Sequence, residues 1–283
     1  MFIYQTKSLT GSRSSNEDEL DILVNHDGED SSKSSINYYA VYDGHGGPNV
    51  SKYIKSRLRK YFTLKQCNFN AEKGKRCNSV IEYIYELLQE KLASSLPSSK
   101  SSGSTALSII QYAKNGIFNQ LKIINLGDCR AVLCKGNNLA VQLTKDHKPM
   151  EWDEYSRITS MGGKIEIASY NIARINGLSV SRALGDLDCK PHVSHIPEMF
   201  DYELEVINGV FKDKFLILGC DGLWDVMSTQ EAVNFVLFKL SEISHLESCN
   251  NSGKNNIALM LGKAAIDKGS EDNISIAIIF FRN

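Results

Sequence analysis

Short runs of β-branched, aromatic and other apolar residues, separated by turn-forming residues, recur along the chain and predict β-strands. Turn-formers such as Asp27-Gly28 and Asn115-Gly116 separate several of these runs. Such short connections are typical of antiparallel hairpins, because parallel strands need crossovers of about a dozen residues or more. The predicted strands are residues 20–26, 36–43, 104–113, 121–127, 130–134, 139–143, 215–220 and 273–281.

Apolar residues at helical spacing predict helices between and after these strands. Within each helix the apolar residues mark one face, which we interpret as a core face. Two polar segments, residues 94–103 and 241–256, are interpreted as mobile connections. The sequence has no internal repeat and no composition break, so we expect a single α+β domain over residues 1–283. The predicted helices lie at residues 50–61, 80–92, 232–240 and 257–265.

The composition narrows the class of protein. With 283 residues, 42% of them hydrophobic, the chain is long enough for a sizeable core. Its formal net charge of −1 argues against a partner held mainly by bulk charge, such as duplex DNA or an anionic membrane. The N-terminal residues do not form an export signal, and no run approaches the ~20 apolar residues of a membrane span. We therefore expect no nucleic acid partner and no membrane association.

The cysteines indicate the cellular compartment of the protein, but they do not indicate a catalytic role. There are seven, without a CxxC pair, which in a chain of this size favours reduced thiols and a cytoplasmic protein, also compatible with the nucleus. None has a nearby histidine in a recognisable arrangement, so a catalytic cysteine is not expected.

Acidic residues occur where the predicted strands begin and end. In antiparallel sheets the end of one strand lies beside the start of its neighbour, so these carboxylates are able to gather at one edge. Asp43, Asp128 and Asp221 end strands, whereas the pair Glu17-Asp18 and Asp272 come just before strands.

Two interpretations of these acids remain open from position alone. A cluster of carboxylates is unfavourable unless it is protonated or bridged by cations, and oxygen ligands without cysteine or histidine favour Mg²⁺, Mn²⁺ or Ca²⁺. The alternative is that each aspartate is a turn residue, which for any single Asp-Gly is the better interpretation.

Short motifs follow one another along almost the whole chain. They read RSSNED (13–18), VYDGHGG (41–47), GSTA (103–106), NLGDCRAVL (125–133), LTKDHKP (143–149), LSVSRALGD (178–186), CDGLWDVMS (220–228) and EDNISIAII (271–279). An isolated Asp-Gly-His would be weak evidence, but the ordered set is specific. In this order the motifs resemble those of the protein phosphatase 2C family, which are metal-dependent serine/threonine phosphatases.

The resemblance implies a fold and a metal site. The implied fold is a four-layer α-β-β-α sandwich with two central antiparallel sheets, and the implied cofactors are two Mg²⁺ or Mn²⁺ ions where strands end, with a weaker third. Asp43 resembles the carboxylate that bridges the two metals, and the Gly44 carbonyl helps to hold one of them. The other residues that the resemblance assigns to the metals are Glu17, Asp18, Asp221 and Asp272, with Asp128 and Asp225 at the third position.

The resemblance also assigns the residues that handle the phosphate. Arg13 resembles the arginine that grips phosphate, through a planar fork that lysine does not match. His45 resembles the general acid that protonates the departing serine or threonine oxygen, for which an imidazole is suited. Metals would neutralise the phosphate charge and lower the pKa of a bridging water, so no covalent phosphoenzyme is needed.

Each assignment has a simpler alternative. His45 could be an exposed turn histidine, and Arg13 a surface residue near a loose N-terminus. Asp186 and Asp146 are interpreted as residues that fix loops through bonds from side chain to backbone.

At the level of the whole protein, the expected substrates are phosphorylated proteins and the expected state is a monomer. A two-metal hydrolase acting on nucleic acid or a diester is disfavoured, because no basic run would bind the backbone. A pseudophosphatase that acts as a binding module remains the alternative, although its ligand positions should then be broken, and here they are intact.

Overall fold

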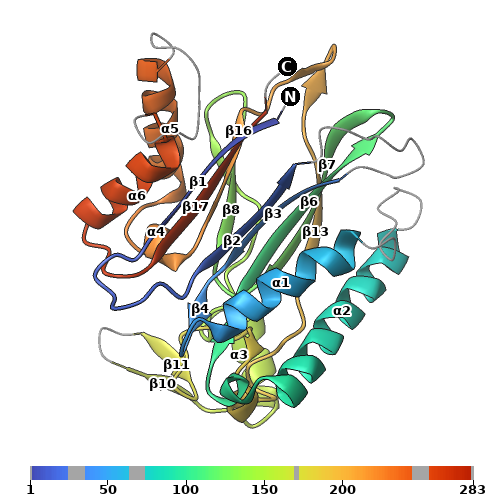
Figure 1. Ribbon diagram of the computed structural model, residues 1–283, viewed down its shortest axis with the longest axis vertical. Coiled ribbons are helices and arrows are strands. Elements are labelled where there is room, and N and C mark those ends of the chain that lie inside the picture. The colour runs from blue at the N-terminus through green and yellow to red at the C-terminus, as the bar shows by residue number, and fades with distance from the viewer. Residues whose placement is uncertain (1, 25–35, 64–73, 169–171, 244–254, 282–283) are drawn as a thin grey trace.

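Two five-stranded antiparallel sheets lie face to face, and helices cover the outer side of each (Figure 1). The computed structural model describes residues 2–24, 36–63, 74–168, 172–243 and 255–281. The first sheet has the order β1 (Phe2–Leu9), β17 (Ile274–Phe281), β16 (Phe215–Gly219), β8 (Arg130–Cys134) and β9 (Ala140–Gln142). The second has the order β13 (Glu198–Glu203), β7 (Ile117–Leu126), β6 (Ala106–Lys114), β3 (Ile36–Tyr42) and β2 (Glu19–Val24).

Side chains alternate between the two faces of each sheet, so the core is divided into layers. Strand β3 is buried over its whole length, and its successive side chains point to opposite faces. Tyr38 and Tyr42 pack under α1 (Asn49–Thr63) and α2 (Gly74–Ser95), whereas Tyr39 packs between the two sheets. This two-sided burial explains why the strand reads as a continuous apolar run.

The other sheet is covered in the same way. Ile276 and Ile278 of β17 pack against α5 (Thr229–Ile243) and α6 (Ile257–Asp267). Ile279 of the same strand faces the layer between the sheets. The predicted fold class, a four-layer α-β-β-α sandwich, is confirmed. Among the described helices, none is long and apolar enough to span a membrane.

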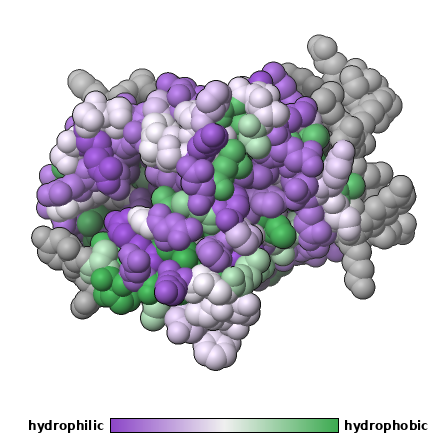
Figure 2. All heavy atoms as spheres, turned by 90° about the horizontal axis from the view of Figure 1, so that it is seen from below, coloured by the Kyte–Doolittle hydropathy of each residue, from purple (hydrophilic) through white to green (hydrophobic). Residues whose placement is uncertain are grey.

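Small elements gather at the lower end of the view in Figure 1. Here lie α3, β4 and the hairpin β10–β11, and Figure 2 shows this end of the molecule from below, largely covered by hydrophilic residues. The shorter elements are β4 (Gly44–His45), β5 (Gly103–Ser104), α3 (Trp152–Ser160), β10 (Ile165–Ile167), β11 (Ala173–Ile175), β12 (Leu184–Gly185), β14 (Val206–Ile207), β15 (Val210–Phe211) and α4 (Asp221–Trp224), with short 3-10 turns at Pro97–Lys100 and Leu187–Cys189.

Several predicted elements differ from the observed ones. Strands β1 and β13 and helix α3 were not predicted, and the interpretation of residues 94–103 as a mobile connection is wrong. This segment contains a 3-10 turn, and its buried Ser99 donates a hydrogen bond to the Leu92 carbonyl. The Asn115-Gly116 turn between β6 and β7 is confirmed, with both residues at positive φ. The Asp27-Gly28 turn and most of residues 241–256 lie outside the described residues.

Candidate metal centre and phosphate site

The predicted acids meet where strands of both sheets end. A pocket of about 380 Å³ lies at this edge. Antiparallel pairing places the start of β2 beside the end of β3, with Glu19 opposite Tyr42, and so brings Glu17 and Asp18 next to Asp43. The pocket is lined, among others, by Arg13, Glu17, Asp43, Gly44, His45, Asp128, Asp221 and Asp272.

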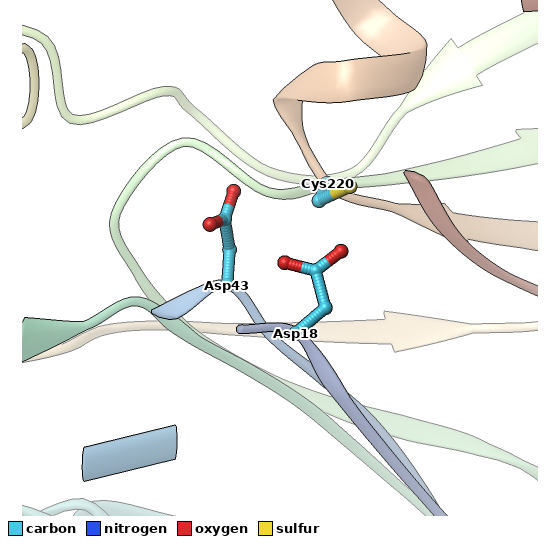
Figure 3. Close-up of side chains that lie close together, drawn as sticks. All are labelled: Asp18, Asp43 and Cys220. Carbon is cyan, nitrogen blue, oxygen red and sulfur yellow. The ribbon is translucent and has the colours of Figure 1, made fainter. Parts of the chain in front are cut away.

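Two groups of acids share Asp43. Asp43, Asp128 and Asp221 each offer a carboxylate oxygen, and these atoms lie within 4.8 Å of one another. A carboxylate oxygen of Asp43 also lies within 4.8 Å of one from Asp18 and of the Cys220 sulfur. Figure 3 shows the side chains of Asp18 and Asp43 next to each other, with Cys220 above Asp18. A carboxylate common to both groups is where a residue bridging two cations should lie.

This crowding makes the acids resist ionisation. Burial, and then repulsion from Asp221 and Asp18, raise the pKa of Asp43 well above its usual value. Burial and the neighbouring Asp128 raise the pKa of Asp221 to about 8, and burial raises that of Asp18 to about 6. Without cations, Asp43 and Asp221 would hold protons near neutral pH, whereas Asp18 would lose its proton as the pH rises through about 6.

The donor set fits hard divalent cations. Oδ2 of Asp18 and Oδ1 of Asp128 are buried without a hydrogen-bond partner. Buried polar atoms are nearly always satisfied, so such orphans need a partner. The Lys148 ammonium lies 3.1 Å from Oδ2 of Asp128 and offsets part of the charge there. Oxygen atoms from several carboxylates are what Mg²⁺ and Mn²⁺ prefer.

Glu17 and Gly44 hold the turn that follows β3. Oε2 of Glu17 accepts a hydrogen bond of 2.9 Å from the Gly47 amide. A Cβ on Gly44 would lie 2.4 Å from the Glu17 carbonyl oxygen, so no other residue fits there without displacing the backbone. The two predicted ligands are therefore adjacent in space, and their metal contacts stay predictions.

Arg13 and Asp272 pair across the mouth of the pocket. Arg13 Nη2 donates to Asp272 Oδ2 at 2.8 Å, and the arginine side chain is 60% exposed. The loop that carries Arg13 is tied to the start of β17, because Asn273 donates from its side chain to the carbonyls of Thr10 and Ser15. Arg13 thus lies on an anchored loop, and its exposed guanidinium faces the pocket.

His45 lies at the pocket wall with a buried acidic partner. Its Nε2 lies 2.9 and 2.8 Å from Oδ1 and Oδ2 of Asp186. The Asp186 side chain is 1% exposed and that of His45 is 27% exposed. The interpretation of Asp186 as a residue that bonds the backbone through its side chain is wrong, because its carboxylate binds an imidazole. Asp146 likewise binds the guanidinium of Arg130.

Unlike the other predicted site residues, Asp225 belongs neither to these carboxylate groups nor to the residues that line the pocket. It caps the C-terminal end of α4, is 59% exposed, and lies 3.7 Å from the Lys148 ammonium. Asp128 and Asp221 approach each other within the described clusters, but Asp225 does not. The predicted third position is therefore only partly assembled here.

The comparisons with known proteins decide the family. The model of the family described as protein phosphatase 2C matches residues 3–274. The chain belongs to the protein phosphatase 2C family.

Relatives support this membership at the level of sequence and fold. The chain is 44% identical over 175 residues to the "PP2C-like domain-containing protein R307" of Acanthamoeba polyphaga mimivirus, covering 57% of this chain and 94% of the relative. It is 36% identical to "Probable protein phosphatase 2C 2" of Oryza sativa, covering 86% of this chain and 61% of that protein, less than two thirds of its length. The crystal structure of a serine-threonine phosphatase 2C from Toxoplasma gondii aligns with a TM-score of 0.73 at 22% identity, covering 99% of this chain and 95% of that one.

Near the site, Lys148 was assigned no role from the sequence, and Asp186 was assigned a loop-fixing role rather than a contact with His45. Lys148 lies in the LTKDHKP motif and Asp186 in the LSVSRALGD motif, so both lay within the family signature of protein phosphatase 2C. Nothing local in either motif indicates a partner, because Asp186 meets His45 across 141 positions of the chain. The only available signal was that each residue belongs to a motif.

Proposed function

We propose that this protein is a serine/threonine phosphatase that hydrolyses phosphoserine and phosphothreonine monoesters at a binuclear Mg²⁺ or Mn²⁺ site. The observation that carries the proposal is the pocket in which acids with raised pKa values and unpartnered oxygens lie beside Arg13 and His45. A surface cluster of turn aspartates would be solvated and would not carry orphaned buried oxygens.

Asp43 would bridge the two ions, because it belongs to both carboxylate groups. The bound ions would neutralise charge on the phosphoryl group and lower the pKa of a water that serves as the nucleophile. The weaker third ion would use Asp128 and Asp225 together with Asp221. The other proposed ligands are Glu17, Asp18, the Gly44 carbonyl, Asp221 and Asp272.

Arg13 and His45 act directly on the phosphorylated substrate: Arg13 binds the phosphate, and His45 donates a proton. Arg13 has further N–H groups beyond the one that binds Asp272, and we assign them to phosphate oxygens. His45 holds a proton on its ring and gives it to the departing serine or threonine oxygen as the bond to phosphorus breaks.

The proposal involves no covalent phosphoenzyme. The thiols nearest the acids are unsuited to attack, because burial raises the pKa of both Cys129 and Cys220 well above the usual value. Cys220 also donates to the Asn273 carbonyl within the core. Water is then the remaining nucleophile that the site would activate.

At the level of the whole protein we propose phosphorylated proteins as substrates, a monomeric state, and a cytoplasmic or also nuclear location. The location follows from thiols that are free in the structure, namely Cys129, Cys134, Cys189 and Cys220.

The test is phosphate release from a phosphothreonine peptide with EDTA, Mg²⁺ or Mn²⁺, for the wild type and Asp43→Ala. Release that requires added metal and is lost in the variant supports the proposal. No release by folded protein with either metal would overturn it and favour a pseudophosphatase that binds partners.

A further inference from the structure

The pair formed by His45 and Asp186 lies apart from the carboxylate groups described above. Asp186 does not line the pocket, whereas His45 does. Asp186 touches the imidazole through both of its oxygens, at 2.9 and 2.8 Å from one nitrogen, Nε2. Its buried position keeps water from competing for that contact.

We propose that Asp186 is the positioning residue of the proton donor: it fixes which nitrogen of His45 delivers the proton. This inference rests on the proposed function. An ionised carboxylate only accepts hydrogen bonds, so Nε2 of His45 carries hydrogen in both protonation states of the ring. Nδ1 is then the nitrogen that gains and gives the exchangeable proton. The same contact holds the ring in one orientation.

The proton balance of the step follows from this arrangement. As water attacks phosphorus, the bond from phosphorus to the serine or threonine oxygen breaks, and its electron pair stays on that oxygen. The oxygen takes the proton from Nδ1 of His45, which becomes a neutral ring still bonded to Asp186 through Nε2–H. The protons of the attacking water stay on the product phosphate, which gives its excess proton to solvent. The carboxylate is not protonated at any point, and solvent restores the proton on Nδ1.

The fold builds this contact with a small sheet of its own. In it β5 lies between β4 and β12, so that Gly103 pairs with His45 on one side and Gly185 on the other. Asp186 follows Gly185, has φ of 48°, and donates its amide to the Ser102 carbonyl. A three-stranded unit thus carries an imidazole and a carboxylate to the same place from distant parts of the chain.

Gly103 leaves the space through which the two side chains meet. A Cβ at this residue would lie 2.0 Å from Oδ2 of Asp186 and 2.6 Å from Nε2 of His45. A second support comes from α2, where buried Gln89 accepts from the Gly185 amide and donates to its carbonyl. The position of Asp186 is therefore fixed from the backbone on both sides, as a positioning role requires.

The experiment compares substrates whose leaving groups differ in their need for a proton. The alkoxide that leaves phosphothreonine is strongly basic and needs protonation, whereas p-nitrophenolate leaves p-nitrophenyl phosphate readily without it. For Asp186→Asn with Mn²⁺ we expect kcat/KM for the phosphothreonine peptide to fall by about 100-fold, the scale of general acid catalysis. With p-nitrophenyl phosphate the fall should be under about threefold, since that step does not use the acid.

Matched variants distinguish positioning from general damage. His45→Gln should show the same substrate split, and adding Asp186→Asn to it should cause no further loss, because Asp186 acts through His45. Asp188→Asn, an exposed neighbour in the same turn, should change neither substrate. Equal losses of Asp186→Asn on both substrates, or no loss on either, would overturn the proposal.

A second readout does not depend on activity. Nitrogen-15 NMR of the imidazole rings in the metal-free protein should show His45 of the wild type with hydrogen on Nε2, and a changed signal in Asp186→Asn. If the wild type hydrolyses neither substrate with metal, the proposed function fails, and the NMR result still decides the contact. Hydrogen on Nδ1 alone in the wild type would contradict the assignment of Asp186.

Discussion

Replacing Asp18 by asparagine should stabilise the metal-free protein at neutral pH, although it removes a predicted ligand. Asp18 is buried, and burial followed by repulsion from Asp272 raises its pKa from 3.8 to about 6. Because the folded-state pKa lies above the unfolded value, the folded chain binds the proton more tightly. Its contribution to stability is complete below pH 3.8 and is lost as the pH rises through about 6.

The size of the effect follows from the same pKa values. One pKa unit corresponds to about 1.4 kcal/mol, so a rise from 3.8 to about 6 amounts to about 3 kcal/mol at pH 8. Asparagine carries no charge and avoids this cost. For a protein of this size the difference corresponds to roughly 5–10 °C in Tm.

The assay is thermal unfolding in EDTA at pH 5 and pH 8. Asp18→Asn should exceed the wild type at both pH values, with about half of its pH 8 advantage at pH 5, because pH 5 lies between the unfolded and folded pKa values. With saturating Mg²⁺ the order should reverse, because the wild type holds the ion more tightly. Asp267→Asn, exposed on α6, serves as the control and should show no such pattern. A metal-free Asp18→Asn that is no more stable than the wild type at pH 8 would refute the claim that the buried, ionised Asp18 destabilises the metal-free protein.

Two further substitutions test the phosphate grip and the packing of the site. Arg13→Lys keeps the charge and loses the planar fork, so we expect KM for the phosphothreonine peptide to rise about tenfold with a smaller change in kcat; an unchanged KM would contradict the assignment. In Gly222→Ala the new Cβ would lie 2.0 Å from the Asn273 carbonyl oxygen and would push α4 away from the start of β17. Calorimetry should then show Mn²⁺ affinity weaker by about tenfold or more, given that ligand distances tolerate only ~0.2 Å. In Gly262→Ala the new Cβ would come closest to the flexible end of the Leu9 side chain, at 2.8 Å, and would meet Ile276 at an ordinary 3.7 Å. This control should leave the affinity unchanged, and equal effects of the two substitutions would argue against our account.

Much of the fold could be predicted from the sequence, because buried apolar residues recur along each strand and helix with the period of that element. Strand β3 is buried on both faces and reads as a continuous apolar run, and the α1 and α2 stripes face one cluster. Strand β1 was missed because it is an edge strand that mixes polar and apolar residues. Its buried Gln5 is satisfied by the Ile257 amide, a contact that no local pattern indicates.

Some residues of the site could likewise be predicted from the sequence, and others could not. The acids were found because strand ends are visible in sequence and antiparallel pairing brings them together, as Asp43, Asp128 and Asp221 show. The partner of His45 was not found, because Asp186 reaches it only through the pairing of β4, β5 and β12. Long-range contacts between two side chains leave no local pattern in either segment.

The central claim is that the carboxylates around Asp43 form a binuclear metal centre, and the most direct measurement is anomalous scattering from crystals grown with Mn²⁺. Our account predicts two manganese peaks on either side of the Asp43 carboxylate, with loss of these peaks in Asp43→Ala. A wild-type crystal that shows no manganese beside Asp43, while the same preparation releases phosphate from the phosphothreonine peptide, would contradict it.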